Sequence, residues 1–92
     1  MAKVQKSSAT REEGDQKLLQ LFGENLKKLR EKKGLSQEQF AYEAGFSRSY
    51  YTEVETGKRN ISLLNILRIT SSLQVEVSDL IKLKDIKSKT KK

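Results

Sequence analysis

The stretch that decides the fold is residues 35–63, which read LSQEQFAYEAGFSRSYYTEVETGKRNISL. Ser36, with Gln39 three residues later, predicts a capping box that begins a short helix, and Gly45 predicts the end of that helix. Ser47 predicts the cap of a second helix, over residues 48–56. Two short helices joined by a glycine turn are typical of a helix-turn-helix.

Helical spacing of apolar residues continues on both sides of this stretch. The preceding segment places Leu18, Phe22, Leu26 and Leu29 on one face of a helix, with Gly34 as its expected C-terminal cap. Ser62 is expected to cap a fourth helix, whose inner face would carry Leu63, Ile66, Ile69, Thr70 and Leu73. Ser78 is expected to cap a short fifth helix with Leu80 and Ile81. The predicted fold is therefore all-α, a compact five-helix domain.

The charge of +7 is unevenly distributed along the 92 residues. Residues 1–15 hold too few apolar side chains to bury a surface, so we expect a flexible N-terminal arm. The domain is expected over 16–83. Residues 84–92 read KDIKSKTKK, five lysines against one aspartate, and are expected to form a flexible lysine-rich tail. A basic chain of this kind favours a polyanionic partner, nucleic acid or a membrane surface.

Several classes of protein are disfavoured by the composition. The chain has no histidine and no cysteine, so disulfides, thiolate or imidazole catalysis and zinc sites built on these ligands are excluded. We expect no cofactor, no metal and no enzymatic activity. No apolar run is long enough to span a membrane, so we expect a cytoplasmic protein without a membrane partner.

The region from about residue 22 to 80 resembles the lambda repressor/Cro-like (XRE) helix-turn-helix family, and is most similar there to controller proteins of restriction-modification systems. The resemblance rests on Arg30, the Gly34-Leu35-Ser36-Gln37 segment, Ala41, Gly45, the Glu55-Thr56-Gly57 segment and Leu73. It implies a regulator that binds double-stranded DNA at a palindromic operator as a homodimer. Such a protein would block or recruit RNA polymerase.

The expected DNA-contacting residues lie on the second helix of the motif and around it. Base-edge readers are Arg48, Ser49 and Thr52, of which Arg48 resembles the family's base reader and can grip guanine with two hydrogen bonds. The resemblance implies phosphate contacts for Gln37, Lys58, Arg59 and Asn60. Tyr50 is open between a phosphate contact through its hydroxyl and packing against the first helix of the motif.

Two further sets of residues have structural roles. The resemblance implies a partly buried ion pair between Arg30 and Glu55; the alternatives are two unrelated surface charges or an Arg30 that faces DNA. Leu64 and Leu67 fall on a second apolar stripe of the fourth helix that its inner face does not use. Together with Val75 and Val77 they are the expected homodimer interface.

Other functions compete with an operator-binding controller. An antitoxin would bind a toxin and use DNA binding for autoregulation, but neither tail carries the apolar residues that folding onto a partner requires. A phage or plasmid repressor would differ only in the genes under control. An enzyme ranks last because no paired carboxylates form a recognisable catalytic motif.

Overall fold

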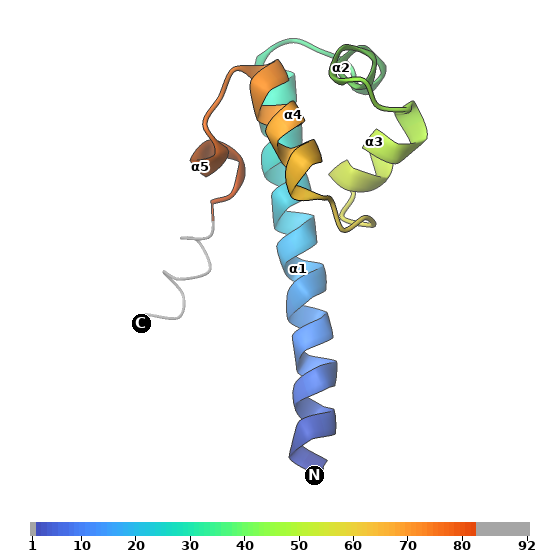
Figure 1. Cartoon of the computed structure of the whole chain (residues 1–92), viewed down its shortest axis with the longest axis vertical. Helices are drawn as coiled ribbons and strands as arrows, with labels where there is room; N and C mark the ends of the chain where they lie inside the picture. The colour runs from blue at the N-terminus through green and yellow to red at the C-terminus, as the bar shows by residue number, and fades with distance from the viewer. Residues whose placement is uncertain (1, 83–92) are drawn as a thin grey trace.

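The computed structural model describes residues 2–82, with side chains from residue 11 onward. The described residues form five helices and no strand: α1 (Ala2–Lys32), α2 (Gln37–Ala44), α3 (Arg48–Glu55), α4 (Leu63–Leu73) and α5 (Val77–Leu80). Figure 1 shows α2 to α5 gathered around the C-terminal half of α1, with the N-terminal half projecting beyond them. The predicted all-α fold with five helices is confirmed.

The first helix is longer than the sequence predicts. Residues 2–15, expected as an arm separate from the domain, continue α1 as helix. This segment has no proline and consists mainly of residues that tolerate helix well, and extending an existing helix requires no new nucleation. Residues 11–17 are exposed, in agreement with their polar composition. The expected tail at 84–92 lies outside the described residues.

The caps of the helix-turn-helix are those predicted. The Ser36 hydroxyl accepts from the Gln39 backbone N–H at 3.0 Å, and the Ser36 N–H donates to Gln39 Oε1 at 3.0 Å. Gly45 ends α2 with φ of 82°, a left-handed conformation in which a Cβ would be strained. Ser47 caps α3 by accepting from the Tyr50 N–H at 3.1 Å. These local bonds set the short turn between the two helices.

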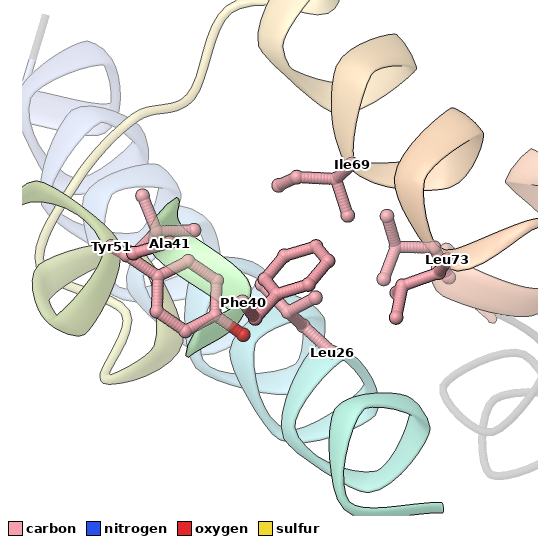
Figure 2. Packing of buried hydrophobic residues seen from close by; sticks show 8 residues of the cluster. Leu26, Phe40, Ala41, Tyr51, Ile69 and Leu73 are labelled. Carbon is pink, nitrogen blue, oxygen red and sulfur yellow. The ribbon is translucent and has the colours of Figure 1, made fainter. Parts of the chain in front are cut away.

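All five helices contribute to one small core. Its fully buried members are Leu26, Phe40, Ala41, Tyr51, Val54, Ile69, Leu73 and Leu80. Figure 2 shows the Phe40 ring between Tyr51 of α3 and the α4 residues Ile69 and Leu73. The Phe40 and Tyr51 rings meet edge to face, with centroids 5.2 Å apart. The core therefore joins both helices of the motif to α1 and α4.

Two predictions at the ends of α4 and α5 are wrong. Leu63, predicted on the inner face, is 70% exposed because it occupies the first turn of α4, before the helix meets the core. Ser78 is not the cap of α5; Glu76 is the N-cap, and its N–H donates to Asp79 Oδ2 at 3.0 Å. A carboxylate three residues into the helix accepts this N–H, so the helix begins earlier than the serine suggests.

Gly23 of α1 lies directly against the C-terminal end of α3. A Cβ at this position would be 2.1 Å from the backbone oxygen of Glu55, far inside van der Waals contact. Further towards the N-terminus of α1, Gln16 Nε2 donates to the backbone oxygen of Gly57 at 2.9 Å. α1 thus holds the end of α3 by backbone contact, which fixes how far α3 stands from the rest of the domain.

No helix between residues 2 and 82 combines the length and the apolar character that a membrane crossing needs.

Candidate nucleic-acid interface

A shallow groove on the exposed side of the helix-turn-helix brings together four of the expected DNA-contacting residues. Its lining consists of Gln37, Arg48, Ser49, Thr52 and Glu53. Arg48 and Ser49 are exposed in the first turn of α3, while Thr52, one turn later, is half-buried. Hydrogen-bonding side chains on one exposed helix face suit the edges of base pairs in a major groove.

Below this surface, Glu55 is the centre of a buried polar cluster. The expected ion pair is present: Arg30 Nε donates to Glu55 Oε2 at 2.6 Å and Arg30 Nη2 donates to Oε1 at 3.2 Å. The Tyr51 hydroxyl donates to Oε2 at 2.6 Å. Arg30 Nη1 donates in turn to the backbone oxygen of Leu35 at 2.6 Å, in the turn before α2. One guanidinium therefore ties α1 to both helices of the motif, and it does not belong to the exposed groove.

The pKa values in the cluster follow from these contacts. Burial alone would raise the pKa of Glu55, but hydrogen bonds from Arg30, Tyr51 and Gln37, with the Arg30 charge, hold it below its ordinary value. The hydrogen bond to Glu55 raises the pKa of Arg30 against the opposing effect of burial. Burial, followed by the bond to Glu55, raises the pKa of Tyr51. At neutral pH the pair is ionised and Tyr51 is protonated.

Gln37 links this buried cluster to the groove. Its Nε2 donates to Glu55 Oε1 at 2.7 Å, while its Oε1 accepts from the Thr52 hydroxyl at 3.3 Å. The side chain, expected to bind a phosphate, is thus engaged inside the protein, and the amide orientation is set by the carboxylate. Sequence reasoning missed this link. In the first turn of α2 the Gln39 N–H is bound by the Ser36 hydroxyl, whereas the N–H groups of Gln37 and Glu38 have no acceptor within the described residues and are available to a phosphate.

The Tyr50 side chain contacts the turn before α3, the helix α4 and the loop after α3, and a phosphate contact through its hydroxyl stays a prediction. Its ring packs on Phe46 in the turn, with centroids 5.3 Å apart, and its hydroxyl accepts from Asn65 Nδ2 of α4 at 3.0 Å. The guanidinium of Arg59 lies over the ring, 5.3 Å from its centroid. The hydroxyl proton can still be donated to an external acceptor.

The loop after α3 presents the remaining three basic or polar candidates, Lys58, Arg59 and Asn60, all exposed. Arg59 is held by an ion pair from Nε to Glu53 Oε1 at 2.7 Å. The Lys58 N–H donates to the backbone oxygen of Glu53 at 2.8 Å. Glu53, which sequence reasoning left out of the site, therefore joins the loop to α3.

The expected dimer residues are unequally exposed. Leu64 and Leu67 on α4 are 58% and 44% exposed, and Val77 is 39% exposed. Val75 packs partly against the core. Leu63, wrongly predicted inside, adds to the exposed apolar surface at this end of α4.

Comparisons with known proteins agree with this geometry. A model of the family described as "Helix-turn-helix" matches residues 26–80. The chain is 50% identical over 60 residues to the control protein C.MunI of Mycoplasma sp, covering 64% of this chain and 81% of that protein. It is 40% identical over 62 residues to the control protein C.BamHI of Bacillus amyloliquefaciens, covering 66% and 76%.

Solved structures with the same fold include the restriction-modification controller protein C.AhdI from Aeromonas hydrophila. That chain is 48% identical, with a TM-score of 0.65 over 67% of this chain and 94% of its own. A hypothetical transcription factor from Neisseria is 32% identical, with a TM-score of 0.69 over 83% and 88%.

Proposed function

Because this chain belongs to the lambda repressor/Cro-like (XRE) helix-turn-helix family of DNA-binding transcriptional regulators, we propose that it binds a palindromic operator as a homodimer and controls a restriction-modification system. The observation that carries the proposal is the groove on α3, in which Arg48, Ser49 and Thr52 share one face. The names of the relatives support the narrower function, since two are control proteins and one is a restriction-modification controller.

In this proposal α3 enters the major groove. Arg48, exposed at the start of the helix, presents its guanidinium to guanine O6 and N7, and Ser49 and Thr52 contact neighbouring base edges. Phosphates on either side are bound by the start of α2 near Gln37 and by the loop after α3. Phosphate contacts fix the register of the protein on DNA, while the base contacts supply sequence preference.

The decisive experiment selects bound duplexes from a random pool, with the wild type and with Arg48→Ala. The wild type should enrich a two-fold symmetric motif. Arg48→Ala should lose preference at one base pair in each half-site by roughly five- to 150-fold, since a bidentate pair contributes about 1–3 kcal/mol. Lys58→Ala is the control, because removing a phosphate-binding side chain weakens binding to all sequences alike. Absence of any enrichment by the wild type would refute the proposal.

The homodimer is proposed to form through α4 and the segment after it. Leu64 and Leu67 are apolar and exposed, and one α3 reads too few base pairs to find a single site. Sedimentation of Leu64→Glu should give a monomer. Tyr42→Glu, at a still more exposed position of α2, should remain dimeric. A Leu64→Glu protein that sediments like the wild type would exclude this surface.

The effect on transcription depends on where the operator lies. An operator that overlaps a promoter excludes RNA polymerase, whereas one immediately upstream allows contact with it. An antitoxin or a phage repressor would share the DNA-binding step, and no observation favours either over a controller. Transcription in vitro from the genes beside the selected operator, with and without the protein, distinguishes repression from activation.

A further inference from the structure

One contact next to the groove is not explained by the proposed function: the ion pair between Glu53 and Arg59. An acidic side chain in a surface that meets phosphates is unfavourable by itself, because like charges repel. Glu53 nevertheless lines the same groove as Arg48, Ser49 and Thr52. Its side chain is about half exposed, so the fold does not require it for packing. A role for this carboxylate must therefore come from what it holds.

The geometry of the ion pair leaves the Nη1 and Nη2 groups of Arg59 available for hydrogen bonds. Glu53 Oε1 accepts from Nε, on the side of the guanidinium, at 2.7 Å. Within the described part of the chain, neither Nη1 nor Nη2 of Arg59 has a hydrogen-bond partner. The two Nη groups form the fork that grips a phosphate or a guanine edge with parallel hydrogen bonds. Glu53 thus binds the guanidinium at Nε and leaves Nη1 and Nη2 available to DNA.

Two further contacts fix the same side chain. The Tyr50 ring lies under the guanidinium at 5.3 Å, a distance at which the ring face attracts a cation. The loop that carries Arg59 is tied to α3, since the Lys58 N–H donates to the Glu53 backbone oxygen at 2.8 Å. A free arginine side chain loses much rotamer freedom when it binds, and one that is already held loses less.

We propose that Glu53 is a positioning residue for DNA binding, which with Tyr50 holds Arg59 so that its Nη fork faces the DNA. The inference rests on the proposed function and identifies a residue that acts through Arg59 without touching DNA itself. The rival interpretation is that Glu53 competes with DNA for Arg59 and so weakens binding. The two differ in the sign of the energetic coupling between positions 53 and 59.

A double-mutant cycle measures this sign. Wild type, Glu53→Ala, Arg59→Ala and the double variant are titrated by fluorescence anisotropy against the duplex selected by the wild type. Removing Glu53 alone eliminates repulsion but also releases Arg59. In the Arg59→Ala background only the repulsion is removed, so Glu53→Ala should tighten binding there. The change in DNA affinity caused by Glu53→Ala should be roughly two- to fivefold less favourable when Arg59 is present than in the Arg59→Ala background. This is the size of coupling expected of an exposed ion pair.

Salt dependence and a control variant complete the test. Arg59→Ala should lower the slope of log affinity against log salt by about 0.9, because one phosphate is then no longer neutralised, and Glu53→Ala should lower it in the same direction. Glu31→Ala removes an exposed acid from α1, and its effect should be the same in both backgrounds. Thermal melts of all variants should match the wild type, since every site is on the surface.

The outcomes separate cleanly. Equal effects of Glu53→Ala in the two backgrounds, or a greater gain in affinity when Arg59 is present, would overturn the inference while leaving operator binding intact. If the wild type enriches no duplex at all, the proposed function fails and this inference fails with it.

Discussion

Replacing the buried carboxylate of Glu55 by its amide tests the part of the structure that holds α3 in place. Glu55→Gln keeps the shape of the side chain but removes the charge opposite Arg30. The side chains of this pair are 8% and 2% exposed, so water cannot replace the missing partner. Four donor groups converge on the carboxylate, and an amide has only one oxygen with which to accept from them.

The expected cost is about 3–5 kcal/mol, the range for leaving one member of a buried ion pair without its partner. A domain of this size has about 5–15 kcal/mol of stability in all, so the variant should lose a large fraction of its stability. At about 4–8 °C per kcal/mol, the melting temperature should fall by roughly 12–40 °C.

Urea unfolding followed by circular dichroism at 222 nm measures the decrease in stability. Glu53→Gln is the matched control, because it removes the same group from an exposed pair and should cost less than about 1 kcal/mol. A second variant, Arg30→Met with Glu55→Leu, replaces the pair by apolar side chains and should recover most of the stability. A Glu55→Gln protein no less stable than Glu53→Gln would refute the reasoning.

Three other outcomes follow from the same structure. Gly23→Ala should lower the free energy of unfolding by about 1–3 kcal/mol or more through its clash with α3. Gly14→Ala has open space around it and should stabilise α1 by up to about 1 kcal/mol, the ordinary gain in helix propensity. Equal effects of the two substitutions in thermal melts would contradict this. Since the folded state lowers the pKa of Glu55, stability should decrease as pH falls below the ordinary value of 4.5, and urea midpoints of the Arg30→Met, Glu55→Leu variant should lack this component. Folding raises the pKa of Tyr51, so just above pH 10 only the unfolded chain releases the Tyr51 hydroxyl proton. The free energy of unfolding should therefore decline above pH 10, and this decline should be smaller in Tyr51→Phe.

The parts of the fold that could be predicted from the sequence are those set by neighbours in the chain. The Ser36 and Gln39 capping box and the left-handed turn at Gly45 depend on separations of a few residues. Side-chain chemistry at such short range is nearly independent of the rest of the protein. The same holds for the outward face of α3, which follows from helical periodicity once its first residue is known.

The parts that could not be predicted depend on how segments distant in the chain pack together or on how far a helix extends beyond its packed region. Gln37 is expected on the surface from its place in α2, yet its amide donates to Glu55, 18 positions later in the chain. The start of α4 at Ser62 is as predicted, but Leu63 in its first turn is exposed, because the packing of α4 against the domain decides which of its turns meets the core. The continuation of α1 through residues 2–15 reflects propagation of a helix past its packed region, which apolar spacing does not report. The roles of the groove residues in DNA binding stay predictions.

The contact at Gly23 also predicts how substitutions would be tolerated along α1. The neighbouring positions Glu24, Lys27 and Lys28 are not buried, and in a library that randomises the helix they should accept most residues other than proline. Position 23 should accept only glycine, because even one methyl group would act as a spacer that lifts the end of α3 away from the domain. In a homodimer that displacement would occur twice, once in each subunit, and would change the distance between the two recognition helices. If the protein binds DNA as the proposed homodimer, the absence of a side chain at position 23 therefore helps to set the separation of the half-sites that it can bind.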